Sequence, residues 1–453
     1  MSRFSLINLG CPKNTVDSEC MLGSLAQAGL EFTPEPLDAD ICLVNTCGFL
    51  DAARQEAAEV FAELVAQREG QGRERPLLVA LGCLVERAGG AGELADFLSA
   101  ADARVGFADY PRLPDICRKL LAGGSHSTPT SGYAGQTLPK TYLDWLSRPR
   151  LRIGSLASAY VKISEGCSHC CSYCSIPLIR GRRVSRPLKA VMKEIRELVL
   201  AGAVELNVIA QDTAAYGLDW GGEPQLPRLL RELRRIPGDL WFRLLYMHPR
   251  NLTADILEEM AADERICPYL DLPLQHVSDG LLKRMGRGHG RKRIEELLQQ
   301  VEKFLPDAAL RTAFIVGHPG EKEADFAELL EFVEAGHFDH VGVFCWSPEP
   351  GTVSAGMADR VAPEVAEERQ DQLMRAQAAV SARRLKGRKG AARMLVERQE
   401  PRGWVGRTAW QAPEVDGETI VTGVKGRCEI GRFLPVKIVR TGTYDCEARR
   451  MKT

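Results

Sequence analysis

The sequence predicts a multidomain α/β protein with a small all-β barrel at its C-terminal end. At 453 residues the chain is too long for one ordinary hydrophobic core, so several domains are expected. Short apolar runs alternate with helical patterns over residues 1–125 and again over residues 153–386, and this alternation is typical of parallel sheets. Residues 387–453 show only short strand-like runs separated by turns, which indicates a small β-barrel.

The composition is that of a folded protein without a global electrostatic field. Hydrophobic residues make up 45% of the chain, charged residues 26%, and the formal net charge is −1. The first residues do not form a signal peptide, and no apolar run approaches the roughly 18–20 residues that span a bilayer. We therefore expect a cytoplasmic protein without a membrane partner. Its 14 cysteines are then expected as buried hydrophobes, metal ligands or catalytic thiols, because disulfides are rare in that compartment.

The first segment, residues 1–125, contains apolar runs that each end at a small or turn residue. The expected strands are residues 4–10, 40–46 and 75–82, and a helical pattern covers residues 51–68. Residues 126–152 are rich in Gly, Ser, Thr and Pro, which predicts a linker or surface loop.

The central segment, residues 153–386, predicts six βα units followed by a polar helix at 363–386. The expected strands are residues 158–163, 204–210, 240–247, 269–274, 309–317 and 340–347. Six such units fit either an open doubly wound sheet or a (β/α) barrel with fewer than eight units. In both folds the chemistry lies at the carboxyl ends of the strands.

The last segment, residues 387–453, is locally basic. It carries 14 Lys and Arg residues against 8 Asp and Glu residues, a net charge of +6. A solvated charged surface and an oligonucleotide-binding barrel explain this charge equally well.

The stretch "GCSHCCSYC" (166–174) packs four cysteines into nine positions. Ligand sets of Cys167, Cys170 and Cys174 or of Cys167, Cys171 and Cys174 can be drawn through it. Structural zinc usually takes two CxxC pairs separated by a dozen or more residues, whereas here the pairs abut. Three thiolates on one short loop suit a [4Fe–4S] cluster with one open iron better. The run follows the first predicted strand of the βα series, at the end where active sites lie.

A second set of cysteines follows the three predicted strands of the first segment. Cys11, Cys47 and Cys83 each come directly after one strand. If these strands are parallel, the three thiols lie at one edge of one sheet, where open α/β sheets place ligands. Three inert buried cysteines and a shared metal site both remain open. Cys20, Cys42 and Cys117 lack this placement and are expected to pack in the core.

These motifs resemble the radical S-adenosylmethionine (SAM) methylthiotransferase family over nearly the whole chain. The spacing Cys167-x3-Cys171-x2-Cys174, within "EGCSHCCSYCSIPLIRGRRVSRP" (165–187), resembles the radical SAM signature in its methylthiotransferase form. The stretches "GCPKNTVDSE" (10–19), "NTCGF" (45–49) and "GCLVER" (82–87) resemble the family's N-terminal domain. "APEVDG" (412–417) resembles part of its TRAM domain, which contacts substrate.

The resemblance implies an architecture, two kinds of cofactor and a reaction. Residues 1–125 would be the N-terminal methylthiotransferase domain, 126–152 a linker, 153–386 a partial (β/α)6 radical SAM barrel and 387–453 a TRAM β-barrel. Cys167, Cys171 and Cys174 would hold one [4Fe–4S] cluster that binds SAM at its open iron, and Cys170 would be spare. Cys11, Cys47 and Cys83 would hold a second [4Fe–4S] cluster that delivers sulfur. A radical generated from SAM would abstract a hydrogen too inert for acid–base chemistry.

Two branches of the family differ in substrate. "GCPKNTVDSE" has Pro-Lys-Asn where the transfer-RNA branch (MiaB-type) typically has Gln-Met-Asn, and residues 209–219, 269–288 and 344–352 also resemble the RimO-type branch. That branch modifies the β-carbon of an aspartate in ribosomal protein S-twelve. The ribosome, a flavodoxin- or ferredoxin-type electron donor and a monomeric state are therefore expected.

Some residues depart from the family pattern. The basic C-terminal segment suits RNA better than a basic ribosomal protein. His248 and His318 stand where an aromatic residue is usual. A transfer-RNA adenosine methylthiotransferase and a non-catalytic, metal-stapled RNA-binding protein therefore remain the alternatives.

Four further positions are candidates for binding SAM. Gly317 and Gly320 follow the fifth predicted strand of the barrel, and Gln211 and Asp212 follow the second. Glycine lets a backbone approach a ligand closely. A tight βα turn would account for the two glycines equally well.

Overall fold

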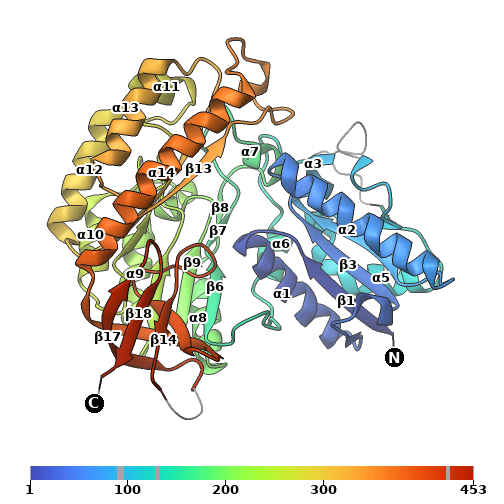
Figure 1. The fold of residues 1–453 in the computed structure, drawn as a ribbon. Coiled ribbons are helices and arrows are strands. Elements are labelled where there is room, and N and C mark those ends of the chain that lie inside the picture. The colour runs from blue at the N-terminus through green and yellow to red at the C-terminus, as the bar shows by residue number, and fades with distance from the viewer. Residues whose placement is uncertain (1, 89–95, 128–131, 425–428, 452–453) are drawn as a thin grey trace.

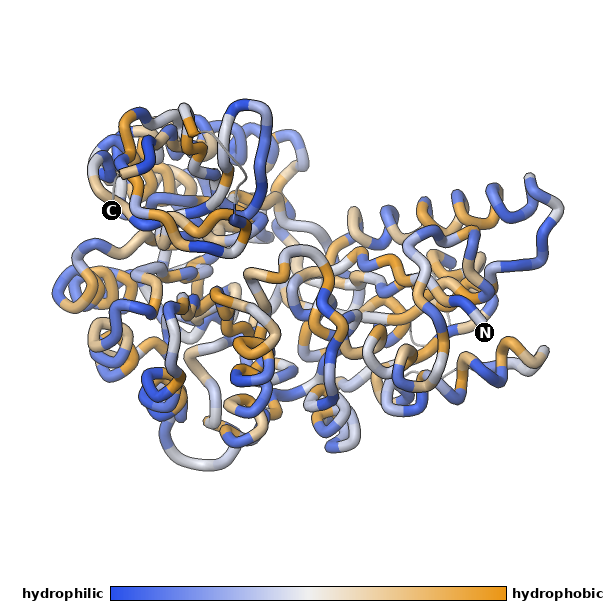
Figure 2. The backbone as a smooth tube through the Cα atoms, turned by 90° about the horizontal axis from the view of Figure 1, so that it is seen from below, coloured by the Kyte–Doolittle hydropathy of each residue, from blue (hydrophilic) through white to orange (hydrophobic). Residues whose placement is uncertain are grey.

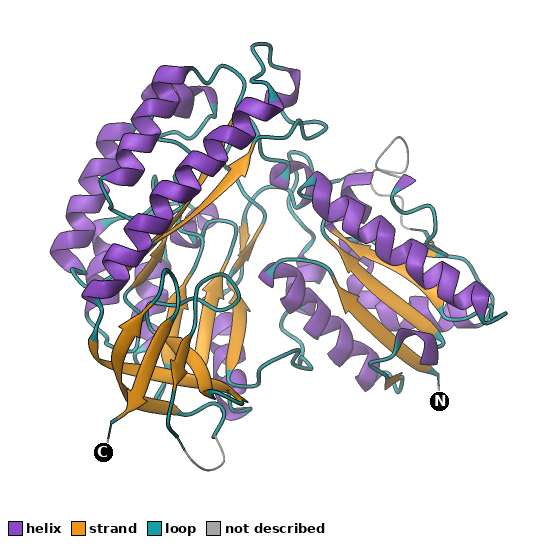
Figure 3. Cartoon of the chain, viewed as in Figure 1, coloured by secondary structure: helices purple, strands orange, loops and turns teal. Residues whose placement is uncertain are grey.

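The computed structural model describes residues 2–88, 96–127, 132–424 and 429–451 of the chain. Figures 1 and 3 show three bodies. An N-terminal sheet flanked by helices faces a larger βα body, and a small barrel of strands packs at one end of that larger body. None of the helices in the described part of the chain combines the length and the apolar composition that crossing a bilayer requires.

The N-terminal sheet has five parallel strands in the order β2-β1-β3-β4-β5. They are β1 (Arg3–Asn8), β2 (Glu31–Phe32), β3 (Ile41–Thr46), β4 (Leu77–Gly82) and β5 (Ala103–Arg104). Its helices are α1 (Pro12–Gln27), α2 (Asp51–Gly70), α3 (Cys83–Ala88) and α5 (Leu113–Leu121). The sequence predicted three of these strands, and the two additional strands have two residues each, too few to show a hydrophobic pattern.

The central body is a partial barrel. Its six parallel strands lie in chain order, as β6-β9-β10 and β11-β12-β13, and a parallel bridge between Phe242 and Ile266 links the two halves. Because the strand order does not reverse, the doubly wound alternative is excluded and the (β/α)6 prediction is confirmed. The strands are β6 (Ser158–Lys162), β9 (Glu205–Ile209), β10 (Trp241–Leu244), β11 (Tyr269–Asp271), β12 (Ala309–Val316) and β13 (His340–Cys345).

Helices cover the outer face of this arc (Figure 1). They are α8 (Leu188–Leu200), α9 (Leu226–Leu233), α10 (Ala254–Ala261), α11 (Asp279–Arg284), α12 (Arg291–Phe304), α13 (Glu323–Glu334) and α14 (Pro363–Gly387). Their apolar residues pack against fully buried strand residues such as Val161, Leu206 and Phe242 in one core. Apolar segments therefore gather inside the body in Figure 2, as expected for strands buried on both faces.

The C-terminal body is a closed five-stranded barrel in the order β14-β15-β16-β18-β17. Its strands are β14 (Gly390–Glu400), β15 (Gly403–Thr408), β16 (Thr419–Val421), β17 (Phe433–Thr441) and β18 (Cys446–Arg450). The pairing register shifts between Val396 and Arg398 and between Ile438 and Arg440, and such bulges increase the local twist that closure needs. The predicted all-β barrel is confirmed.

The predicted linker is not a solvated loop where it is described. Residues 128–131 lie outside the described part, but residues 140–145 form α6 (Lys140–Trp145). The side chains of Tyr142 and Trp145 are buried, and both rings contact Tyr110 of the N-terminal body. The segment therefore packs between the N-terminal and central bodies.

Short elements complete the described part of the chain. They are the helix α7 (Ile176–Ile179), the antiparallel strands β7 (Ser164–Glu165) and β8 (Val184–Ser185), and the 3-10 helices η1 (Pro36–Asp38), η2 (Phe107–Arg112), η3 (Thr213–Ala215), η4 (Leu218–Trp220) and η5 (Ser354–Gly356).

Candidate active site

The N-terminal sheet carries three cysteines at one edge. Cys11, Cys47 and Cys83 follow β1, β3 and β4, which are adjacent parallel strands. Cys11 is the residue before α1, whose first residue is Pro12, and Cys83 begins α3. In the order β2-β1-β3-β4-β5 the chain moves to one side of β1 with β2 and to the other side with β3. Open α/β sheets bind ligands at the carboxyl ends of the strands at such a reversal.

The cysteine-rich loop lies at the carboxyl end of β6. The pairing of β7 with β8 closes the loop, and Gly166 has a φ of +72°, which favours glycine. The amide of Cys167 donates to the carbonyl of Gly181 at 3.0 Å, and the amide of Cys174 donates to the carbonyl of Cys171 at 3.1 Å. These bonds fold the loop back on itself.

Both sets of cysteines line one cavity of about 340 Å³. Its walls include Cys11, Cys47, Cys83, Cys167, Cys171 and Cys174. Cys170 is exposed to solvent and is not part of the wall. The structure therefore places the two groups of three cysteines around a common space and turns the fourth cysteine of the loop away from it.

The chemistry of the donor set, two groups of three thiols around one cavity, is the kind that iron–sulfur clusters take. A tetrahedral zinc with Zn–S bonds of about 2.3 Å holds its sulfurs about 3.8 Å apart. No three His, Cys, Asp or Glu side chains of the described residues converge in a way that could hold a metal ion. Burial raises the pKa of the Cys83 thiol to about 12 and of the Cys167 thiol to about 11. Thiolates here therefore need a directly bound cation, which an iron cluster supplies.

Three cationic side chains and no carboxylate line the described cavity wall. Arg287 donates to Sγ of Cys171 at 3.3 Å and to the Tyr173 hydroxyl at 3.2 Å. Arg180 donates from Nε to Sγ of Cys83 at 3.3 Å. The third cation is Lys13. This positive lining suits sulfur ligands that carry negative charge.

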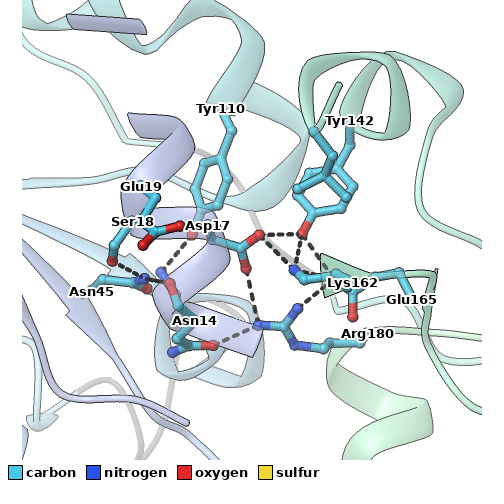
Figure 4. Close-up of polar contacts among 12 residues, drawn as sticks. Asn14, Asp17, Ser18, Glu19, Asn45, Tyr110, Tyr142, Lys162, Glu165 and Arg180 are labelled. Atoms are coloured by element: carbon cyan, nitrogen blue, oxygen red, sulfur yellow. Dashed lines mark hydrogen bonds and ion pairs between the residues drawn. The ribbon is translucent and has the colours of Figure 1, made fainter. Parts of the chain in front are cut away.

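A buried ionic network joins helix α1 of the N-terminal body to the barrel (Figure 4), and one of its members, Arg180, also lines the cavity. Lys162 Nζ lies 2.6 Å from Asp17 Oδ1 and 2.7 Å from Glu165 Oε2. Arg180 lies 2.6 Å from Glu165 Oε2 and 3.3 Å from Asp17 Oδ2. The Tyr142 hydroxyl oxygen lies 2.8 Å from an oxygen of each carboxylate, and its single proton serves one of them. Burial opposes ionisation of Glu165, but Arg180 and Lys162 outweigh it and hold its pKa well below the usual range.

The network determines how the two cysteine sets face each other. Asp17 is on α1 of the N-terminal body, whereas the two cations and Glu165 belong to the barrel. Two positive and two negative charges balance, so burial leaves no net charge at the contact. The contact therefore favours one orientation of the N-terminal body, in which its cysteines face the loop.

Gln211 and Asp212 have different positions relative to the cavity. Gln211 lines it and donates to Glu165 at 2.5 Å. Asp212 is buried behind the wall and holds Nε2 of His169 at 2.7 Å, and His169 stacks on His248 with ring centroids 3.9 Å apart. Burial and neighbouring Arg287 lower the pKa of His248, so its ring is neutral.

Gly317 and Gly320 are not part of the described cavity wall, which does not favour the expectation that they bind SAM. Both have a positive φ, +76° and +85°. A Cβ on Gly317 would stand 2.6 Å from Cβ of Ala366, and one on Gly320 would meet the side chain of Arg284. These contacts are consistent with a tight turn against α14 and α11, and the SAM contact of the two glycines stays a prediction.

Several cavity residues were missed by reasoning from the sequence. Lys13 and Arg287 lie within motifs that were singled out for other reasons. Tyr246 and Gln275 also line the cavity, and both have a positive φ, +62° and +74°. Such conformations are uncommon outside glycine and concentrate at functional sites, but no sequence pattern reports them.

Known proteins match every part of this architecture. The radical SAM superfamily matches residues 161–333, "Uncharacterized protein family UPF0004" matches residues 3–106 and the TRAM domain matches residues 390–450. Among solved structures, the radical SAM methyltransferase TsrM from Kitasatospora setae superposes with a TM-score of 0.54 at 14% identity. It covers 76% of this chain and 73% of its own. The cobalamin-dependent radical SAM enzyme OxsB gives 0.51 at 12% identity, covering 83% of this chain and 56% of its own. At these identities the likeness concerns the fold.

Fold and site together define a radical SAM enzyme with an additional N-terminal cysteine domain. The ribosomal protein uS12 methylthiotransferase RimO of Geobacter sulfurreducens is 43% identical over 98% of this chain and 97% of its own. The RimO proteins of Symbiobacterium thermophilum and Desulforudis audaxviator are 41% and 40% identical, over 98% and 100% of this chain and 90% and 98% of their own. The chain belongs to the RimO family of radical SAM methylthiotransferases.

Proposed function

We propose that this protein adds a methylthio group to the β-carbon of an aspartate in ribosomal protein uS12. The observation that carries the proposal is the common cavity, because sulfur insertion needs the radical source and the sulfur source at one carbon atom. Relatives that match along nearly the whole chain support uS12 as the substrate.

Each set of cysteines has its own part in this proposal. Cys167, Cys171 and Cys174 hold one [4Fe–4S] cluster, and Cys11, Cys47 and Cys83 hold the other. When bound, the clusters and SAM supply the radical that activates the carbon and the sulfur that is inserted. Cys170 has no ligand role, which its exposure supports.

The remaining residues hold these groups in place. Arg287 and Arg180 stabilise negative charge on the sulfurs of Cys171 and Cys83. Gln211 contacts SAM from the cavity wall, whereas Asp212 acts through His169 as a positioning residue. We do not extend the SAM assignment to Gly317 and Gly320.

The contacts of the C-terminal barrel favour an enzyme over an RNA-binding module. Arg407 forms a two-point ion pair with buried Glu205 of β9, at 3.1 and 2.5 Å. Arg388 and Arg393 also pair with carboxylates of the central body, Asp339 and Asp239. Part of the basic charge of residues 387–453 therefore holds the C-terminal barrel on the central body.

We also propose the working context of the enzyme. It acts as a monomer in the cytoplasm, where ribosomal proteins are found, and receives electrons from a flavodoxin- or ferredoxin-type protein. The principal test is mass spectrometry of ribosomal proteins and transfer RNA from cells that lack the gene. Loss of one methylthio group from uS12 is expected, with transfer RNA unchanged; loss from transfer RNA alone would overturn the proposal.

A further inference from the structure

Lys13 is an almost completely buried lysine in the wall of the cavity that both cysteine sets share. It is the second residue of α1, and the residue is 8% exposed. Its Nζ atom stands 3.0 Å from the centroid of the Tyr246 ring. A cation over an aromatic face is held in position, but its charge is not neutralised.

Tyr246 is itself fixed in an unusual conformation. It follows β10 with a φ of +62°, and its amide donates to Oδ2 of Asp271 at 3.0 Å. A non-glycine residue in this region costs on the order of 1 kcal/mol and persists where its surroundings hold it. The ring is therefore a built support for the ammonium group, directed at the cavity.

Lys13 differs from the other two cationic side chains of the cavity wall in having no direct polar partner among the described residues. Arg287 and Arg180 each donate to a cysteine sulfur, and Arg180 is also paired with two carboxylates. Across the described residues, Nζ of Lys13 makes no hydrogen bond or ion pair. No carboxylate lines the wall there either. The carboxylates of Asp271 and Glu165 act on the charge of Lys13, but neither forms an ion pair with it. A buried ammonium group without a directly paired anion is costly, so its natural partner is an anion that enters the cavity.

We propose that Lys13 binds the side-chain carboxylate of the aspartate that is modified. This inference rests on the proposed function, in which an acidic side chain enters the cavity to place its β-carbon near both cysteine sets. Because the carboxylate is bonded to that carbon, an ion pair with Lys13 holds the reacting atom within the cavity. The same contact distinguishes aspartate from asparagine.

The test compares two forms of uS12 on the cluster-loaded enzyme. Purified uS12 and a variant with asparagine at the target position are titrated anaerobically against the wild type, Lys13→Met and the control Lys193→Met. Lys193 is exposed on α8. The wild type and the control should bind the aspartate form about 10- to 100-fold more tightly than the asparagine form, as expected for a charged hydrogen bond. Lys13→Met should bind both forms alike, and Lys13→Arg should keep part of the preference.

Two outcomes would overturn the inference. The first is that the wild type binds the aspartate and asparagine forms of uS12 equally. This result needs no enzyme variant, so it decides the matter even if Lys13→Met does not fold. The second is that Lys13→Met still prefers the aspartate form of uS12 over the asparagine form as strongly as the wild type does. Loss of iron from Lys13→Met with the preference intact would assign Lys13 to cluster binding instead.

The proposed function fails separately from this inference. If the wild type cleaves SAM but never modifies uS12, the substrate assignment is wrong. If the wild type modifies uS12 while Lys13→Met keeps the aspartate preference, only the role of Lys13 is wrong.

Discussion

Arg180 of the central barrel donates a 3.3 Å hydrogen bond to the sulfur of Cys83, which lies in the N-terminal domain. The same guanidinium pairs with Asp17 and Glu165, one from each side of the contact. One side chain therefore links the orientation of the two domains to a proposed cluster ligand.

Replacing Arg180 with leucine is expected to destabilise the protein strongly. The change leaves Asp17 and Glu165 with one buried cation in place of two, and removing one partner of a buried pair costs about 3–5 kcal/mol. Thermal and denaturant unfolding of Arg180→Leu, compared with Arg196→Leu at an exposed position of α8, measures this loss. Equal stability of the two variants would contradict the role of the network.

The cysteine loop allows a matched pair of adjacent substitutions. Cys170→Ser is expected to keep the iron content of the wild type, because Cys170 is exposed and outside the cavity wall. Cys171→Ser should lose about half of the iron and all cleavage of SAM. Iron analysis and measurement of 5′-deoxyadenosine under anaerobic reducing conditions check both. Iron loss from Cys170→Ser with retention by Cys171→Ser would reverse the ligand assignment.

The N-terminal cysteines are expected to be needed for sulfur transfer but not for radical formation. Cys47→Ala should still produce 5′-deoxyadenosine, because the ligands on the loop are intact. It should form no methylthiolated uS12, since the second cluster lacks one of its three ligands. If Cys47→Ala methylthiolates uS12 at the wild-type rate, the two-cluster proposal is wrong.

Docking of the C-terminal barrel should depend on pH. Burial opposes ionisation of Glu205, but Arg407 and Arg243 outweigh it and lower its pKa to about 2 from an ordinary value of 4.5. A carboxyl group with a lowered folded-state pKa stabilises the fold above pH 4.5, and this contribution is lost as the pH falls toward 2. At pH 7 the thermal unfolding midpoint of Glu205→Gln should lie well below that of the wild type. The difference between the two midpoints should become smaller near pH 3. A gap independent of pH would exclude this ionisation.

Much of the architecture could be predicted because its signals are local. All six barrel strands were predicted because each is a short apolar run that ends at a turn, a pattern set by neighbouring residues. The strands β2 and β5 were missed because two residues carry no period. For Gly317 and Gly320 the chain alone does not separate close approach to SAM from a tight turn, because glycine suits both, and their contact with SAM stays a prediction.

The sequence by itself determined the fold class and predicted two sets of cysteines, because spacing along the chain and position after a strand are local properties. The choice of the six ligands rests on the family resemblance and stays a prediction. Tertiary structure decided that both sets line one cavity, that Cys170 faces solvent and that Lys13 lies over Tyr246 without a directly paired anion among the described residues. These facts depend on contacts such as that between Asp17 and Lys162, 145 positions apart. Burial and charge balance at such contacts arise when distant segments pack together, so no local pattern encodes them.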